Sequence, residues 1–218
     1  VQNYVNRIPE VGQAVGAKFL QPLAKLLEFD NVSYETSDKR PLLQGLSFKL
    51  AAGRQWALVS TDPQEAQAVA HLLPRFIEPQ SGKILIDGED LAWVTLESLR
   101  AETLLVSGCD AVLSGTVRDN IGGGQKHGSL QEVTEAAKLS HAHNFIVKLP
   151  QGFETLIGEQ GEALDAGQCL RLGLARAALR KPALLIIEEP LEPLDEDTKP
   201  LIDDAYSRLA PGRTVIYL

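Results

Sequence analysis

The chain has 218 residues, of which 44% are hydrophobic, and its formal net charge at pH 7 is −8. A chain of this length can bury one sizeable core. The acidic balance argues against a nucleic-acid partner, because binding to phosphates depends on clustered lysines and arginines. No apolar run approaches the roughly 20 residues that a helix needs to span a bilayer, so the sequence predicts no membrane span within these residues.

Residues 1–26 are predicted to form a linker. Apolar side chains recur there at loose helical spacing, but Pro9, Gly12, Gly16 and Pro22 interrupt the pattern. Because proline and glycine interrupt helices, we expect one or two short helical turns in this segment. An ordinary N-terminal helix fits the pattern about as well and stays open as an alternative.

The next part of the sequence changes to a period of two. LEFDNVSYE (27–35) and LLQGLSFKL (42–50) alternate apolar and polar residues, which is typical of antiparallel strands. QWALV (55–59) predicts another strand, which a loop over 60–68 joins to a helix. The sequence therefore begins with β structure and then passes into a strand, loop and helix.

Two later segments also predict secondary structure. Ser129 followed by Glu132 forms the pattern of a capping box, which predicts that a helix begins there. TVIYL (214–218) predicts a further core strand.

Two neighbouring segments carry the strongest functional signal. ALLIIEEPLEPLD (183–195) opens with five apolar residues and continues into two carboxylates, as a buried parallel strand does when it ends in acidic groups. LDAGQCLRLGLARAAL (164–179) places a Gly-Gln pair at the beginning of an apolar helix. A helix N-terminus presents unpaired N–H groups and a positive dipole end, which suit an anion such as a phosphate.

Together these segments resemble the signature motif and the Walker B strand of ATP-binding cassette (ABC) ATPases, and the order of motifs over 27–218 is similar to that of exporter-type half-transporters. The resemblance implies an α/β fold: a P-loop NTPase-type core, an N-terminal antiparallel β subdomain and an inserted helical subdomain at about 112–165. It implies that residues 1–26 link this domain to a transmembrane domain. The family's switch histidine and C-terminal helices are missing, so we expect the cassette to be incomplete at its C-terminal end.

This sequence departs most from the family in the phosphate-binding loop, where the family pattern is G-x-x-x-x-G-K-[ST]. The residues at the family's nucleotide-contacting positions are Ser60 and Glu65 for the glycines, Ala66 for the lysine, Gln67 for the Mg²⁺ ligand, and Ala68 after it. Asp62 and Glu65 add negative charge, and Pro63 removes an N–H donor. Because each lost charge-assisted hydrogen bond is worth roughly 1.5–3 kcal/mol, we expect ATP and Mg²⁺ to bind weakly or not at all.

Two other nucleotide positions of the family are also altered or uncertain. Tyr34 falls where the resemblance places an aromatic residue against the adenine ring, and a half-buried strand tyrosine is an equally open interpretation. Gly108 stands at the position of the glutamine that joins Mg²⁺ and the attacking water to the membrane domain. Glycine has no side chain for that role.

The signature motif LSGGQ appears in this sequence as LDAGQ. Asp165 and Ala166 replace its serine and first glycine, whereas Gly167 and Gln168 are retained. A carboxylate that faces a γ-phosphate is repulsive unless it is protonated or bridged by a cation. Asp165 is also a good helix N-cap, so we expect it to cap the helix and to repel the phosphate.

The carboxylates after the buried strand occupy the catalytic positions of the family. By resemblance, Glu188 stands at the position of the Mg²⁺-associated aspartate and Glu189 at that of the general base. Glu189 is therefore the one catalytic side chain retained. We expect it to be idle, because a base without bound phosphate has nothing to act on.

The resemblance leads to a function with several open alternatives. We expect a degenerate nucleotide-binding domain of an ABC exporter-type transporter, which supports ATP-driven transmembrane transport while it binds or hydrolyses ATP poorly itself. Its partners would be a second cassette, as a homo- or heterodimer, and a transmembrane domain at the cytoplasmic face of a membrane. The alternatives are a regulatory or scaffolding pseudo-ATPase that acts through protein–protein contact, and an ATP-binding domain with residual ATPase activity.

Overall fold

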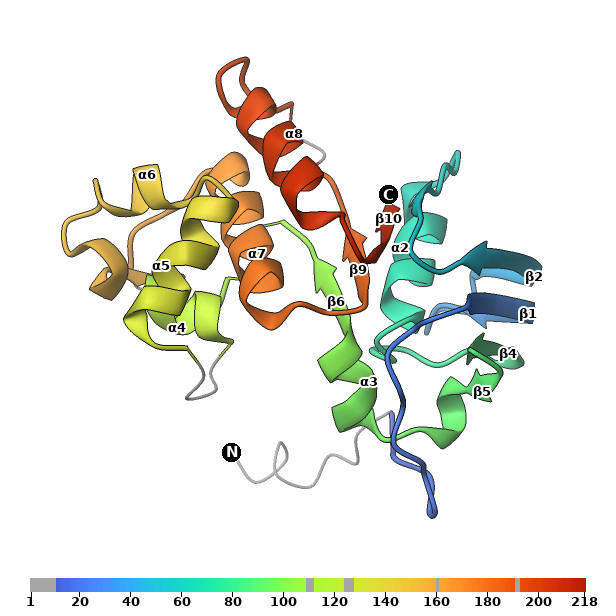
Figure 1. Cartoon of the computed structure of the whole chain (residues 1–218). Helices are drawn as coiled ribbons and strands as arrows, with labels where there is room; N and C mark the ends of the chain where they lie inside the picture. Colours follow the sequence, from blue (N-terminus) through green and yellow to red (C-terminus); the bar gives the residue numbers. More distant parts are fainter. Residues whose placement is uncertain (1–10, 109–111, 124–127, 160, 191–192) are drawn as a thin grey trace, which may run out of the picture. The chain divides into compact units, whose positions relative to one another are not determined.

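The computed structural model describes residues 11–108, 112–123, 128–159, 161–190 and 193–218 (Figure 1). The chain divides into two compact units: unit 1 consists of Val1–Ala52 and Leu58–Thr103, and unit 2 consists of Gly53–Ala57 and Leu104–Leu218. Among the described residues, no helix combines the length and the apolar character that crossing a membrane requires.

Unit 1 contains a four-stranded antiparallel sheet. Its strands, in the spatial order β2-β1-β4-β5, are β2 (Pro41–Ala51), β1 (Leu26–Glu35), β4 (Ser81–Ile86) and β5 (Glu89–Asp90). Phe29 of β1 is fully buried and stacks on Phe48 of β2, with the ring centroids 4.5 Å apart. The antiparallel strands predicted over 27–35 and 42–50 are therefore confirmed.

The helices of unit 1 are α2 (Pro63–Leu72), the short 3-10 helix η1 (Leu91–Trp93) and α3 (Leu96–Glu102). Helix α2 buries an apolar face that includes Ala66, Ala68 and Val69. The sequence predicted a loop over 60–68, but the helix begins at Pro63. The reason is local: Asp62 caps the helix and a proline at its first position needs no hydrogen-bond partner.

The described part of the linker, residues 11–25, is irregular, with one turn in which the N–H of Ala17 donates to the carbonyl of Ala14 at 3.2 Å. The N–H of Lys18 donates to the carbonyl of Trp93 at 2.8 Å, and the N–H of Thr95 donates to the carbonyl of Lys18 at 2.8 Å. Leu20 is buried within the same unit. One short turn, as the linker prediction allowed, is therefore present at Ala14–Ala17, whereas the alternative of an ordinary helix is not seen within residues 11–25, where pairing with a distant segment outweighs local helical spacing. The first ten residues lie outside the described part.

The side chain of Arg75 holds this linker by a hydrogen bond. Its guanidinium is only 5% exposed and donates to the carbonyl of Leu91 and, through its other terminal nitrogen, to the carbonyl of Gly12, each at 2.9 Å. The same group forms an ion pair with Glu78. A buried charge needs such partners, since an unpaired guanidinium would be costly to desolvate.

Unit 2 contains a second sheet of four strands. Their order is β3 (Gln55–Ala57), β10 (Thr214–Tyr217), β9 (Leu184–Ile187) and β6 (Thr103–Val106). Strand β10 runs parallel to both β3 and β9. All four residues of β9 are buried, which explains its continuous apolar run.

The helices of unit 2 lie between and after these strands. They are α4 (Val117–Gly122), α5 (Leu130–Leu139), α6 (His143–Ile146), the 3-10 helix η3 (Gly152–Glu154), α7 (Ala166–Arg180) and α8 (Thr198–Leu209), and a small pair of strands, β7 (Gly115–Thr116) and β8 (Leu156–Ile157), accompanies them. Helices α4 and α5 both pack against α7 (Figure 1). The capping box of Ser129 and Glu132 forms as predicted.

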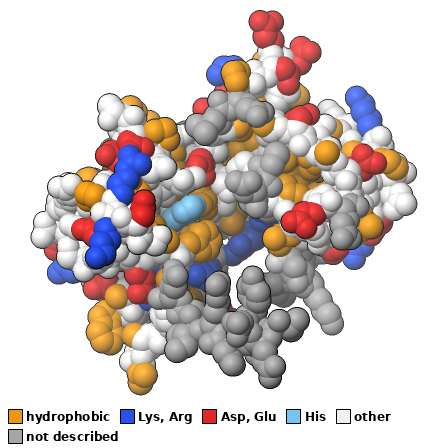
Figure 2. All heavy atoms as spheres, turned by 180° about the vertical axis from the view of Figure 1, so that it is seen from behind, with side chains coloured by type: hydrophobic (Ala, Val, Ile, Leu, Met, Phe, Trp, Pro, Cys, Tyr) orange, Lys and Arg blue, Asp and Glu red, His pale blue; other side chains and the backbone are white. Residues whose placement is uncertain are grey.

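The surface of the described residues is mixed in charge. On the face that Figure 2 shows, acidic and basic side chains are interspersed with apolar and polar ones, and no field of a single sign covers the described part of that face.

A single carboxylate organises the start of the sheet in unit 1. Asp87 accepts hydrogen bonds from the backbone N–H groups of Ala24, Lys25 and Leu26 at 2.8, 2.8 and 2.7 Å. Partial burial acts to raise the pKa of Asp87, but the three N–H donors outweigh it and hold the pKa below its usual value. Asp87 and Gly88 both have positive φ, so this turn needs residues that tolerate the left-handed region.

The substitution Asp87→Asn should destabilise the fold by about 1 kcal/mol, allowing for solvent screening of a largely exposed group. Because the folded pKa is depressed, this contribution is present above the unfolded pKa of about 3.9 and is lost as the pH falls through the folded value. Urea unfolding at pH 7 and at pH 3 measures it. Asp30→Asn, which removes an exposed ion pair with Lys83, is the control. Equal losses of stability in both variants, or a loss of stability in Asp87→Asn that does not depend on pH, would contradict this role of Asp87.

Candidate functional site

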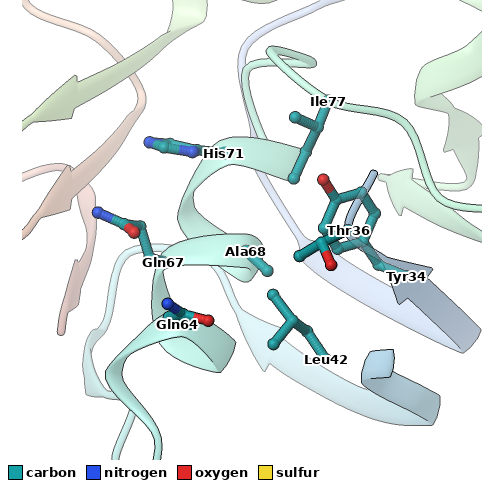
Figure 3. Close-up of a pocket in the computed structure, with 8 residues that line it drawn as sticks. All are labelled: Tyr34, Thr36, Leu42, Gln64, Gln67, Ala68, His71 and Ile77. Atoms are coloured by element: carbon teal, nitrogen blue, oxygen red, sulfur yellow. The ribbon is translucent and has the colours of Figure 1, made fainter. Parts of the chain in front are cut away.

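Unit 1 contains a pocket with a volume of about 260 Å³ (Figure 3). Its lining residues are Tyr34, Thr36, Leu42, Gln64, Gln67, Ala68, His71 and Ile77. Tyr34 comes from β1, Leu42 from β2, and four of the others from one side of α2. Leu42 points toward Ala68, whereas the ring of Tyr34 lies beside Thr36 and Ile77 (Figure 3).

The N-terminus of α2 is closed by groups of the chain itself. The carboxylate of Asp62 accepts from the N–H of Gln64 at 2.9 Å, and the carbonyl of Asp62 accepts from the N–H of Glu65 at 3.0 Å. Arg40 donates to the carboxylate of Asp62 and, at 2.8 Å, to the side-chain oxygen of Gln64. A carboxylate at this place satisfies the free N–H groups and the positive end of the helix dipole.

The segment before α2 is also bonded internally. The hydroxyl of Ser60 donates to the carboxylate of Glu65 and accepts from the N–H of Asp62 at 3.2 Å. The acidic side chains that the sequence placed in this loop are therefore held against the helix N-terminus. The N–H of Asp62 is therefore already bonded within the chain.

The residues predicted to contact nucleotide in this part of the chain divide into two groups. Tyr34, Gln67 and Ala68 line the pocket, whereas Ser60, Glu65 and Ala66 are not among its lining residues. Tyr34 is half-buried in its strand and forms part of the pocket wall, and its role against an adenine ring stays a prediction. Ala66 is buried in α2.

In unit 2, Asp165 and Gln168 cap the N-terminus of α7. The carboxylate of Asp165 accepts from the N–H of Gln168 at 2.7 Å, and the side-chain oxygen of Gln168 accepts from the N–H of Asp165 at 3.1 Å. Ala166 is the first helical residue. The predicted N-cap role of Asp165 is confirmed.

Gly167 is fixed by a close approach between two helices. A Cβ atom at this position would lie 2.6 Å from the Cγ2 atom of Thr198, the first residue of α8. Such a distance is below any ordinary van der Waals contact, so only glycine fits without movement. The glycine that the motif retains thus has a packing role in this structure.

The acidic pair follows β9, as the sequence predicted. The N–H of Glu188 donates to the carbonyl of Val106 at 2.9 Å, which ties the end of β9 to the end of β6. Gly108 follows β6 closely, and a Cβ atom there would meet no atom within 4 Å. The fold therefore does not require glycine at this position.

Glu189 is exposed and lies near two tyrosines. The rings of Tyr206 and Tyr217 meet edge to face, with centroids 5.2 Å apart. Burial raises the pKa of the Tyr206 hydroxyl, and the nearby charge of Glu189 raises it further. The pKa of Tyr217 is raised for the same two reasons. A negative charge next to these phenols favours their neutral forms.

Sequence reasoning did not find Arg40 or the wall residues Leu42, His71 and Ile77. Arg40 lies in a polar turn 22 residues before Asp62, and nothing local marks it as a partner. The Asp-Pro pair at 62–63 was a usable signal, because aspartate before proline is a common helix start. It would have placed the start of α2 correctly.

Comparison with known proteins defines the class of this fold and site. The profile described as "ABC transporter" matches residues 43–192. The chain belongs to the ABC transporter family, and its relatives among exporters identify it as an ATP-binding domain of the exporter type.

Individual relatives agree with this assignment. The chain is 34% identical over its full length to the ATP-dependent lipid A-core flippase of Syntrophus aciditrophicus (strain SB). It is 38% identical, over 86% of its length, to the putative multidrug export ATP-binding/permease protein YgaD of Bacillus subtilis (strain 168). These alignments span only 36% and 33% of the two relatives, so the chain corresponds to about a third of such proteins.

A solved structure confirms the fold. A bacterial Atm1-family ABC exporter with ATP bound matches 99% of this chain at a TM-score of 0.87 and 37% identity, and the match covers 38% of that exporter chain. The α/β cassette fold with an antiparallel β subdomain, which the resemblance implied, is therefore confirmed.

The substitution Gly167→Ala should destabilise the domain by about 1–3 kcal/mol, because the new methyl group overlaps the Thr198 methyl. Thr198→Ser removes that methyl and keeps the hydroxyl, so the double variant should recover most of the loss in urea unfolding at pH 7. Gly108→Ala, which meets open space, is the matched control and should change stability by less than about 0.5 kcal/mol. If Gly167→Ala lowers the stability by the same amount with and without Thr198→Ser, the contact with Thr198 is not the cause of the loss.

Proposed function

We propose that this chain is the nucleotide-binding domain of an exporter-type transporter, and that its own site binds MgATP weakly or not at all. It supports ATP-driven transport across a membrane as one of two paired cassettes, attached to a transmembrane domain at the cytoplasmic face. The observation that carries the proposal is the N-terminus of α2, where Asp62 already accepts the N–H of Gln64. An anion that bound there would have to displace a carboxylate of the chain.

The donor set does not fit a triphosphate. A phosphate loop offers free backbone N–H groups, but those of Gln64 and Glu65 are bonded to Asp62, and Pro63 has none. From Gln67 onward the amides of α2 bond within the helix. Ala66 cannot supply the positive charge that lysine brings to the phosphates.

Electrostatics supports the same conclusion. The carboxylates of Asp62 and Glu65 lie in or next to the first turn of α2, and Arg40 already pairs with Asp62. A triphosphate would therefore meet two negative charges and a cation that is engaged elsewhere. Like charges at close range are repulsive.

The Mg²⁺ positions fit a metal poorly. Gln67 offers a neutral amide oxygen, and Glu188 is one methylene longer than the aspartate of the family. Mg²⁺ demands near-ideal octahedral geometry and is normally shared between a carboxylate and the phosphates.

The altered signature motif would weaken the paired site as well. In this family the signature faces the γ-phosphate that the partner cassette holds, and here Asp165 stands in place of serine. Its carboxylate is committed to the Gln168 N–H, and it brings a negative charge to that position. Both sites of a cassette pair would therefore lose phosphate contacts, and Glu189 would have little substrate to act on.

Isothermal titration should detect no Mg²⁺-dependent ATP binding to the wild-type chain in the micromolar range. The loss of about three charge-assisted bonds of roughly 1.5–3 kcal/mol each weakens the dissociation constant more than about a thousandfold. A variant that combines Ser60→Gly, Asp62→Ser, Glu65→Gly, Ala66→Lys and Gln67→Ser should gain Mg²⁺-dependent binding. Micromolar binding of MgATP by the unmodified chain would refute the proposed site.

Hydrolysis is tested separately with Glu189→Gln. Because the proposal leaves this carboxylate without bound phosphate, the wild-type chain and the variant should release inorganic phosphate from ATP at the same background rate. A steady wild-type rate that disappears in Glu189→Gln would show instead that the site is a working ATPase.

A further inference from the structure

One histidine joins three elements of unit 2. His141 lies in the turn between α5 and α6, where its backbone has a φ of 56°. Histidine is among the few residues other than glycine that adopt this left-handed conformation with any frequency. The N–H of His141 donates to the carbonyl of Lys138 at 3.2 Å, and the side chain of His141 is only 19% exposed. The turn therefore holds the imidazole in a defined place within the unit.

The imidazole of His141 contacts helix α8. Its Nε2 atom lies 2.5 Å from Oδ2 of Asp204, which is 63 residues further along the chain. Since an ionised carboxylate can only accept, Nε2 carries the proton of this hydrogen bond. The same oxygen pairs with Nε of Arg208 at 2.6 Å. Asp204 is therefore held by two side chains, of which only Arg208 belongs to its own helix.

The backbone of His141 is bonded to helix α7. Its carbonyl accepts from Nη1 of Arg171 at 3.4 Å. Arg171 is buried, its Nε donates to the carbonyl of Gly167 at 3.1 Å, and its guanidinium lies 5.1 Å from the centre of the Phe145 ring. A displacement of the turn would therefore also disturb the first turns of α7.

The charges around His141 leave its contact with Asp204 dependent on pH near neutrality. Around it stand ionisable side chains from each neighbouring helix: Lys138 of α5, His143 of α6, Arg171 of α7, and Asp204 and Arg208 of α8. Lys138 pairs with Glu135, and the ring of His143 lies beside that of Phe153. Lysine and arginine stay charged throughout the neutral range, whereas an unperturbed histidine loses its proton near pH 6.5.

Asp204 stays ionised over the same range. The hydrogen bond from His141 is the largest influence on the pKa of Asp204 and lowers it, and the nearby charge of Arg208 lowers it as well. When His141 is protonated, the contact joins two opposite charges, and when His141 is neutral only one partner is charged. Because a hydrogen bond between two charged groups is the stronger one, the contact weakens as the pH rises from 6 to 8.

We propose that the contact between His141 and Asp204 is a pH-sensitive clamp, which ties the α5–α6 turn to α8 most tightly in mild acid and loosens when His141 loses its proton. Loosening releases the turn from α8, and it weakens the support that the His141 carbonyl gives to Arg171 near the start of α7. The clamp involves no nucleotide, so it can fail or hold independently of the proposed function.

A double-mutant cycle with His141→Asn and Asp204→Asn measures the clamp by urea unfolding at pH 6.0 and pH 8.0. Asparagine tolerates the left-handed conformation, so the first change removes the imidazole without adding backbone strain. The coupling between the two changes should be about fivefold in the unfolding equilibrium constant at pH 6.0, and about twofold or less at pH 8.0. A coupling that is equal at both pH values, or absent at pH 6.0, would overturn the proposal.

Arg208→Gln is the matched control, because it removes the other partner of the same carboxylate. Arginine keeps its charge over this range, so the coupling between Arg208→Gln and Asp204→Asn should change little between pH 6.0 and pH 8.0. If the coupling falls by the same factor in both cycles, the pH effect does not come from His141 and the clamp is refuted.

Hydrogen exchange on the wild-type chain tests the loosening without any variant. The N–H of Ala142 donates to the carbonyl of Ala137 at 2.8 Å beside the clamp, and the N–H of Val133 donates to the carbonyl of Ser129 at 3.1 Å in the first turn of α5. After correction for the intrinsic effect of pH on exchange, the protection of the Ala142 amide should fall about threefold between pH 6.0 and pH 8.0, while that of Val133 stays the same. Equal changes at the two amides, or no change at Ala142, would contradict the loosening.

Discussion

The proposed loss of nucleotide binding depends on the interaction between the Asp62 carboxylate and the N-terminus of α2. The carboxylate caps the helix, it accepts the N–H of Gln64, and Arg40 holds it from the neighbouring turn. In a phosphate loop, the same N–H groups and the same positive end of the helix dipole would face a nucleotide. Here the chain itself supplies the anion, so the helix end is stable without any ligand. Glu65, which pairs with Ser60, completes this arrangement.

In unit 2 the N-terminus of α7 is likewise capped by groups of the chain itself. Asp165 and Gln168 cap each other at the start of α7, and Gly167 is retained where α7 approaches Thr198. Packing therefore explains why glycine stands at position 167. Gly108, in contrast, stands in open space, so its lack of a side chain reflects no demand of the fold. The contacts that cap α2 and α7 in this structure thus lie within the chain.

The sequence predicted what local chemistry determines. The capping box of Ser129, the N-cap at Asp165 and the buried strand before Glu188 all depend on residues within a few positions of each other, and each was confirmed. The pairing of the linker was not foreseen, because Lys18 bonds to a segment more than 70 residues away. The same limit explains why the partner of Asp62 was missed. A turn arginine carries no sign of the carboxylate that it will meet after folding.

A direct test of the central claim is a ¹H–¹⁵N NMR titration of the chain with MgATP, in which the backbone amides of Gln64 and Glu65 are followed. These two N–H groups are bonded to Asp62 in the structure. The account predicts that their resonances stay in place while MgATP is raised into the millimolar range. Large, saturable shifts of both amides at micromolar MgATP would show that phosphates displace the Asp62 carboxylate, and would contradict it.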